Sequence, residues 1–275
     1  MYFRNYSINT GKTIRLKRIF DESGKAVIFA PVHNMTSPKP YNGQVDVSDA
    51  VDKAVAGGAN AMIMSKGFLR LSANKWNGQV GILNYLFTYA ALSPDPIKQV
   101  AVSTVEESLR IGADGVCFFV GLSTNNDSEV IEMLGKVGDL CDRYGLVFAA
   151  EAEFPGFYQS QQSHLEKHGV EYLKFTARLC AELGCDLIST NWTGSFETFA
   201  DLVDYVKIPV LINGGEKMPE ADFLKMIEDS VKAGGSGCLV GRNFSEAYDV
   251  TKIVRAASGI IREGIRAEEA CRGLL

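Results

Sequence analysis

Eight short apolar runs recur along the chain, and their spacing is the feature that most restricts the possible fold. Each run is too short for a helix and rich in β-branched or small residues, as buried strands are. Amphipathic helical patterns separate most of them. The centres of the runs lie near residues 28, 63, 88, 117, 149, 188, 211 and 239. Eight strands separated by about one strand–helix unit each predict an α/β fold of the (β/α)8 TIM-barrel type.

A doubly wound open sheet is the main alternative to the barrel. That fold usually places a Gly-x-Gly-x-x-Gly sequence after its first strand, whereas Pro31-Val32-His33-Asn34 follows here. The chain of 275 residues is 46% hydrophobic and has no linker, so we expect a single domain over residues 1–275. Basic and apolar residues alternate at helical spacing over about 13–20, and this short helix is expected to close the bottom of the barrel.

Local sequence patterns predict further strands and helices along the chain. The third strand is expected at 85–92, and the segment 67–81 before it reads as irregular. Ser103-Thr104-Val105-Glu106 has the form of a capping box that opens a helix. Later helices are expected over 172–183 and 245–261.

Composition and charge exclude several classes of partner. The net charge of −5 argues against non-specific binding to nucleic acid or to anionic membranes. No run reaches the roughly 18 to 20 apolar residues that span a bilayer, and the first nine residues lack a signal-peptide pattern, so we expect a cytoplasmic protein. The six cysteines form no C-x-x-C pair and are expected to be reduced. His164 and His168, four residues apart, favour a solvated helix face over a metal site.

Glycines end two neighbouring strands near the C-terminus. The run 208–213 ends in Gly214-Gly215, and the run 237–240 ends in Gly241-Arg242. Glycine lets backbone N–H groups approach a ligand closely, and arginine adds a fork of donors. In this fold, phosphate sites recur after strands seven and eight. The pattern therefore predicts a phosphate-binding site that includes Lys217; ordinary tight turns are the alternative.

Other polar residues at strand ends are candidates for catalysis, because barrel sites lie at the carboxyl ends of the strands. Glu151 and Glu153 share one side of the fifth strand and could act as general acid and base or hold a divalent ion, unless they point outward. Lys66 could be a nucleophile or could pair with a carboxylate. His33 could shuttle a proton or be structural. Ser189 and Asn191 share a face and could bind hydroxyl groups.

Several motifs together resemble a known family. They are Arg15 to Phe20, Ala177-Arg178, Glu182 to Asp186, Trp192-Thr193-Gly194, Pro209 to Gly215 and Gly241-Arg242-Asn243. In this order they resemble the archaeal-type class I fructose-bisphosphate aldolases and the related autoinducer-phosphate thiolases. The resemblance covers nearly the whole chain and is strongest over 177–244.

The resemblance implies a lysine on strand six that forms a Schiff base with the substrate ketone, and here it falls on Ser189. Two further departures agree with that loss. The family's Asp-His-Gly after strand one reads Val32-His33-Asn34, and the tyrosine at the end of strand five matches Phe154 or Ala152. The glycine motifs match unchanged. The resemblance thus implies a retained phosphate-ester site with altered chemistry.

The function expected from these features is that of an aldolase-like lyase, or a related transferase or isomerase, without the Schiff-base lysine. Its substrate would be a phosphorylated sugar or keto compound. The alternative is a catalytically inactive pseudoenzyme that binds a sugar phosphate. We expect no cofactor, no nucleic acid or membrane partner, and, by analogy with the family, a homo-oligomer.

Overall fold

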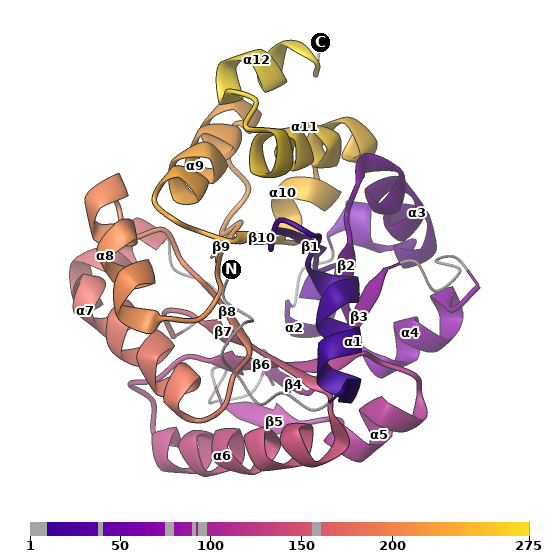
Figure 1. Ribbon diagram of the computed structural model, residues 1–275, viewed down its shortest axis with the longest axis vertical. Coiled ribbons are helices and arrows are strands. Elements are labelled where there is room, and N and C mark those ends of the chain that lie inside the picture. Colours follow the sequence, from indigo (N-terminus) through magenta and orange to yellow (C-terminus); the bar gives the residue numbers. More distant parts are fainter. Residues whose placement is uncertain are drawn as a thin grey trace.

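Eight parallel strands close into a barrel, and seven of them coincide with the apolar runs (Figure 1). The computed structural model describes residues 10–37, 41–74, 80–89, 92, 98–155 and 161–274. Each barrel strand pairs with the strands before and after it in the chain, and the last pairs with the first. This confirms the predicted (β/α)8 barrel and excludes the open sheet. The barrel strands are β1 (Ala26–Phe29), β2 (Ala61–Met64), β3 (Gly81–Tyr85), β6 (Gly115–Val120), β7 (Val147–Ala152), β8 (Leu187–Thr190), β9 (Val210–Asn213) and β10 (Gly237–Val240).

Helices surround the barrel, and several begin at side-chain caps that the sequence supplies. Thr104 accepts a hydrogen bond from the Glu107 amide at the start of α5, and Ser195 forms a capping box with Thr198 at α8. The helices are α1 (Thr10–Ile19), α2 (His33–Thr36), α3 (Val47–Gly57), α4 (Lys66–Ser72), α5 (Val105–Arg110), α6 (Asp127–Tyr144), α7 (Gln161–Glu182), α8 (Phe196–Val206), α9 (Glu220–Lys232), α10 (Arg242–Ser245), α11 (Val250–Glu263) and α12 (Ala267–Arg272); Asn42–Gln44 forms one 3-10 turn.

Successive strand residues point alternately outward to the helices and inward to the barrel axis. The outward residues form the larger apolar cluster with the helices, and the inward ones form a second cluster inside the barrel. Leu16 and Ile19 of α1 belong to the inner cluster. The Lys12 ammonium lies 2.5 Å from Asp142 and 3.2 Å from Asp186, the latter one residue before β8. Helix α1 therefore covers the barrel end at which the strands begin.

The third barrel strand does not lie where the sequence patterns predicted it. It was expected at 85–92, but β3 spans Gly81–Tyr85, and the apolar residues after it form a separate hairpin of β4 (Phe87–Tyr89) and β5 (Gln99–Ala101). Part of the expected strand and the turn at 93–96 fall outside the described residues. The consequence for the site is that Tyr85, expected to begin a strand, stands at its carboxyl end.

Three helical segments also differ from expectation. The segment expected to be irregular contains α4, and the last long helix begins at Val250, because the separate short α10 occupies 242–245. Helix α7 starts eleven residues before the expected Tyr172 and is kinked at Gly169, whose φ of 74° is non-helical. The early start of α7 brings two histidines towards the barrel mouth.

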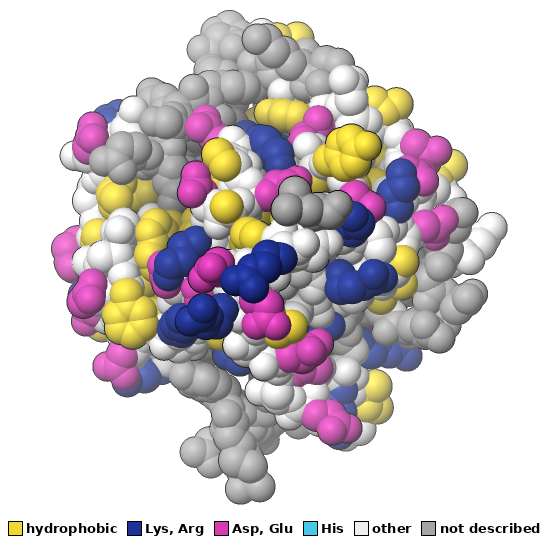
Figure 2. Space-filling view, turned by 90° about the horizontal axis from the view of Figure 1, so that it is seen from above, with side chains coloured by type: hydrophobic (Ala, Val, Ile, Leu, Met, Phe, Trp, Pro, Cys, Tyr) yellow, Lys and Arg dark blue, Asp and Glu magenta, His cyan; other side chains and the backbone are white. Residues whose placement is uncertain are grey.

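The described surface has mixed charge. Figure 2 shows basic and acidic side chains side by side on one face, among scattered hydrophobic ones, without a broad area of one sign in the coloured atoms. Within the described residues, no helix is both long enough and apolar enough to cross a bilayer.

Candidate active site

A pocket opens at the barrel end where the strands finish, opposite α1. It encloses about 800 Å³, its open mouth included. Its walls come from the ends of strands and from the loops that follow them. The lining residues are Ala30, Val32, His33, Thr36, Tyr85, Phe119, Glu151, Glu153, Phe154, His164, Asn191, Asn213, Gly214, Gly215, Glu216, Leu239, Gly241 and Arg242.

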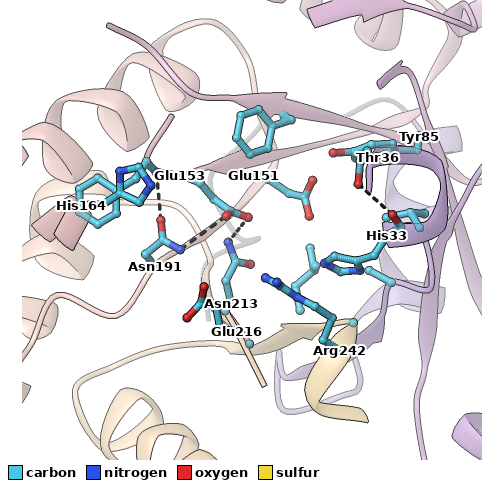
Figure 3. Close-up of a pocket in the computed structure, with 18 residues that line it drawn as sticks. His33, Thr36, Tyr85, Glu151, Glu153, His164, Asn191, Asn213, Glu216 and Arg242 are labelled. Atoms are coloured by element: carbon cyan, nitrogen blue, oxygen red, sulfur yellow. Dashed lines mark hydrogen bonds between the residues drawn. The ribbon is translucent and has the colours of Figure 1, made fainter. Parts of the chain in front are cut away.

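Two carboxyl groups from one strand lie at the centre of this pocket. Glu151 is in β7 and Glu153 follows its last residue, so alternation along the strand sends both side chains inward. Both line the pocket, and Figure 3 shows their carboxyl groups turned towards its open space. Glu151 is buried, with 7% of its surface exposed. The outward orientation considered for this pair does not occur.

Amide and phenol donors hold the two carboxyl groups. The Nδ2 atom of Asn213 donates to Glu153 at 2.6 Å, and that of Asn191 lies 3.5 Å from it. The Oδ1 atom of Asn191 accepts the Phe154 backbone N–H at 3.0 Å, which fixes the orientation of its amide. Glu151 shares a hydrogen bond with the Tyr85 hydroxyl. Glu153 thus has two amide donors, and Glu151 has a phenol.

Burial raises the pKa of both carboxyl groups, and repulsion by Glu153 raises that of Glu151 further. Removal from water raises the pKa of Glu153 to about 7, although the Arg242 charge and Asn191 act in the opposite direction. Removal from water, and then the charge of Glu153, raises the pKa of Glu151 to about 8, opposed by the Tyr85 hydrogen bond. Because the two groups interact, they titrate as a pair. Near neutral pH the pair therefore holds about one proton.

His33 and Arg242 form the opposite wall of the pocket. Burial, followed by the nearby Arg242 charge, lowers the pKa of His33 to about 3, so its ring is neutral. A Cβ atom at position 241 would lie only 2.3 Å from His33 Cε1, so glycine is required there for the ring to fit. Arg242 lies over the Tyr41 ring at 5.9 Å, and its buried Nε has no hydrogen-bond partner. Its guanidinium group points into the pocket (Figure 3).

The side chain of Asn243 holds the loop that follows β9 and contains Gly214 and Gly215. The Nδ2 atom of Asn243 donates to the carbonyls of Gly214 and Glu216, each at 2.8 Å. Its Oδ1 atom accepts the Met218 N–H at 3.0 Å. Gly215 has a φ of 66°, in the left-handed region that favours glycine. Asn243 thus couples the loop after β9 to the end of β10, which brings Gly214, Gly215 and Gly241 to one side of the pocket.

We expect Asn243→Ala to lower the free energy of unfolding by about 1 to 3 kcal/mol, because one buried and two partly buried backbone groups lose their partner. Urea denaturation measures the change. Asn126→Ala, at the N-cap position of α6, where the side chain makes no capping hydrogen bond, is the matched control and should cost less than about 0.5 kcal/mol. Equal losses in the two variants would show that Asn243 does not hold the loop.

Three sequence-predicted residues do not line the pocket. The Lys66 ammonium lies 2.9 Å from Glu107 on α5, so the carboxylate pair considered for it is present. Lys217 is exposed beside the loop. Ser189 is buried inside the barrel next to Glu151, its partner in the β7–β8 register. The remaining predicted residues, His33, Glu151, Glu153, Asn191, Gly214, Gly215, Gly241 and Arg242, all line it.

Sequence reasoning missed five polar residues of the pocket wall. Asn213 directly precedes the glycine pair and could have been found from that position. Tyr85 was hidden by the misplaced strand, and Glu216 and Thr36 lie in loop or short helical segments without a pattern. His164 also lines the pocket, where its ring stacks on Phe154 at 5.7 Å. The described residues contain no group of three or more potential metal ligands of the His, Cys, Asp and Glu type.

Titratable groups with shifted pKa values, gathered at the carboxyl ends of barrel strands, are the arrangement of an active site on a (β/α)8 scaffold. The chain belongs to the DeoC/LacD aldolase family, whose pattern matches residues 27–247. This confirms the resemblance inferred from the motifs.

Individual relatives agree with the family. The 2-amino-3,7-dideoxy-D-threo-hept-6-ulosonate synthase 1 of Archaeoglobus fulgidus is 30% identical over 259 residues, which cover 94% of each chain. The corresponding synthase of Halobacterium salinarum is 29% identical over 265 residues, or 95% of this chain and 96% of the other. A Schiff-base-forming fructose-1,6-bisphosphate aldolase of solved structure is 27% identical with a TM-score of 0.78, covering 91% of this chain and 99% of its own.

Proposed function

We propose that the protein is an aldolase-like enzyme that breaks or forms a carbon–carbon bond in a phosphorylated sugar or keto compound, or acts through an enediolate. Glu151 and Glu153 would supply general acid and base in place of a Schiff-base lysine. The observation that carries the proposal is the pair of carboxyl groups that point from one strand into the pocket. Because burial raises the pKa of both, we expect the pair to hold about one proton near neutral pH. One member can then accept a proton while the other donates one.

The residues that surround the pocket support chemistry without an imine. None of the described lining residues is a lysine. Lys66 is engaged by Glu107, and position 189 is serine. The aldolase of solved structure is named for its Schiff base, so this chain would keep the family's fold and replace its electron sink.

A balanced cleavage can be written with these groups. The ionised carboxylate, Glu153, removes the proton from the hydroxyl group two carbons from the substrate carbonyl. The bond between the hydroxyl-bearing carbon and the carbon next to the substrate carbonyl breaks, and the hydroxyl-bearing carbon becomes the carbonyl group of one product. The electron pair of the broken bond moves onto the substrate carbonyl oxygen, which gives an enolate. Arg242 and Tyr85 are donors for that oxygen. The protonated Glu151 then delivers its proton to the enolate carbon, and the proton on Glu153 passes to Glu151.

Binding of the phosphate group would use the other side of the pocket. Gly214, Gly215 and Gly241 leave the backbone open there, and Arg242 supplies a positive charge. Asn191, Ser189 and the neutral His33 would position substrate hydroxyl groups, and Lys217 would lie near the entrance. We also propose that the protein is a cytoplasmic homo-oligomer that works without a cofactor.

The test is a screen of ketose mono- and bisphosphates for aldol cleavage, with the released aldehyde measured by a coupled dehydrogenase. We expect turnover, and Arg242→Ala should raise KM by about 10-fold or more through the lost charge-assisted contact. Binding without turnover of any substrate would instead identify the sugar-phosphate-binding pseudoenzyme. Neither binding nor turnover would reject both functions.

A second prediction concerns Lys66. Lys66→Ala should change turnover by less than about 3-fold, because the side chain pairs with Glu107 outside the pocket. Borohydride reduction in the presence of substrate should leave no adduct on the chain, as mass spectrometry can show. A trapped adduct at Lys66, together with a loss of activity of about 100-fold or more in Lys66→Ala, would show that Lys66 is the nucleophile.

A further inference from the structure

Glu153 lies one residue beyond the end of β7, at the limit of the hydrogen-bond ladder of the barrel. The last residue pair between β6 and β7 joins Val120 to Ala152, and the Glu153 amide donates to the Val120 carbonyl at 3.1 Å. The next peptide unit, which joins Glu153 to Phe154, lies beyond the strand. A general base must be held within about 0.5 Å of its working position, so this peptide unit needs support from outside the strand.

Two side chains from other parts of the fold hold this peptide unit at both of its polar atoms. On one side, the Oδ1 atom of Asn191 accepts the Phe154 N–H at 3.0 Å (Figure 3). On the other, the Tyr172 hydroxyl of α7 lies 3.3 Å from the Glu153 carbonyl and 2.9 Å from the Leu122 carbonyl, so its one proton can bridge the two oxygens. The peptide unit after the base is therefore held between the end of β8 and α7.

The side chain of Tyr172 is itself fixed by several contacts. Its oxygen accepts the Leu122 N–H at 2.6 Å, and its ring packs on those of Phe154 and His168, with centroid distances of 5.6 Å and 5.1 Å. Removal from water raises the pKa of Tyr172, so the hydroxyl keeps its proton across the working pH range. One hydroxyl group thus connects the segment after β6 with the segment after β7.

The carboxyl group of Glu153 has donors of its own, and they depend on where the backbone lies. Asn213 donates to it at 2.6 Å, and Asn191 lies 3.5 Å from it. Both amides come from other strand ends, so a movement of the Glu153 backbone would change these distances. Misplacement of a catalytic group by about 1 Å can lower the rate by about 10²-fold. Tyr172 does not line the pocket, but it can influence the reaction in this way without contacting the substrate.

We propose that Tyr172 is a positioning residue that acts through Glu153: its hydroxyl group holds the end of β7 so that the carboxyl group keeps its amide donors and faces the substrate. The inference rests on the proposed function, since it concerns the base of the same reaction. A purely structural role would stabilise the fold and leave Glu153 unchanged in the folded protein. The two roles therefore differ in what Tyr172→Phe does to the carboxyl pair.

The titration of the pair reports where Glu153 lies. Amide donors favour its ionised form, so their loss should raise the pKa of Glu153 above its value of about 7. Other titratable or charged groups face the pair or Tyr172, and Tyr172→Phe removes none of them. Those around the pair are Tyr85, Tyr89, Cys117, His33, Glu216 and Arg242, and those around Tyr172 are Asp127, His168 and Cys180. A shift in Tyr172→Phe would therefore indicate that Glu153 has moved.

Tyr172→Phe removes the hydroxyl group and keeps the stacked ring. NMR of protein labelled with a carbon isotope at the glutamate carboxyl groups follows the pair and needs no substrate; we expect its lower apparent pKa to rise by about 0.5 unit or more. With a ketose phosphate found in the screen, kcat should fall by about 10-fold or more and KM should change by less than about threefold. Tyr144→Phe, the same change at the last residue of α6, is the matched control and should alter neither.

A double variant shows whether Tyr172 acts through Glu153. In Glu153→Gln the base is already lost, so the further change Tyr172→Phe should lower kcat by less than about twofold. An unchanged titration, an unchanged kcat, or two losses that multiply in the double variant would overturn the inference. If the wild-type protein cleaves no substrate, a shifted titration in Tyr172→Phe would keep Tyr172 as the residue that positions Glu153 and reject the proposed reaction alone.

Discussion

Glu153→Gln should lower kcat by about 10²- to 10⁴-fold, the usual contribution of a positioned general base. Glutamine has nearly the same shape, and its oxygen can still accept the 2.6 Å hydrogen bond of Asn213, so that only the 3.5 Å contact of Asn191 is given up. A loss of this size would therefore be mainly chemical. Glu151→Gln should cause a loss of similar size by removing the proton donor. Both are measured by steady-state kinetics on a ketose phosphate that the screen has identified.

The pH profile tells a catalytic role from a structural one. The charge of Glu153 helps to raise the pKa of Glu151, so its removal in Glu153→Gln should shift the residual activity profile to lower pH. Glu132→Gln, on the exposed face of α6, is the control and should change kcat by less than about twofold. A residual profile that keeps the wild-type pH dependence would mean that the pair does not titrate as a unit.

The parts of the fold that sequence reasoning placed correctly are those with a strong local signal. β6 is a continuous apolar run, β7 is apolar apart from Glu151, and glycine follows β9 and β10 directly. β3 was not predicted because its Asn84 is polar yet buried, where its Nδ2 atom donates to the hydroxyl groups of Ser103 and Ser108. The aromatic run that follows it looked more like a strand. Long-range hydrogen bonds of this kind leave no periodic pattern.

In the site, too, the residues with a local sequence signal were predicted and the others were missed. Alternation along one strand predicted that Glu151 and Glu153 share a side, and adjacent strands brought Gly214 near Gly241. Lys66 had the right position in the chain, but α4 begins at that residue and directs it to Glu107. Tyr85 and His164 reach the pocket through a misplaced strand end and through the kinked start of α7. Their positions follow from tertiary packing, which one sequence does not encode locally.

Raising the pH from about 5 to 8.5 should make the wild-type protein less stable relative to Glu151→Gln, by about 2 to 4 kcal/mol across this range. The folded pKa of Glu151 lies above its unfolded value, so the native state binds more protons between the two. Its stability is therefore fully present below the unfolded pKa and is lost as pH rises through the folded one. Glutamine cannot ionise and escapes this loss.

Urea unfolding of both proteins at about pH 5, 7 and 8.5 measures this difference, and the subtraction cancels the titration of His33 and His168, whose lowered pKa values act on both proteins alike. Glu132→Gln is the control. Lys136 lowers the pKa of Glu132, so that group is ionised in both states across the range, and its difference from wild type should stay constant. A constant difference for Glu151→Gln as well would mean that burial does not raise the pKa of the pair, and the acid–base chemistry proposed for it would lose its physical basis.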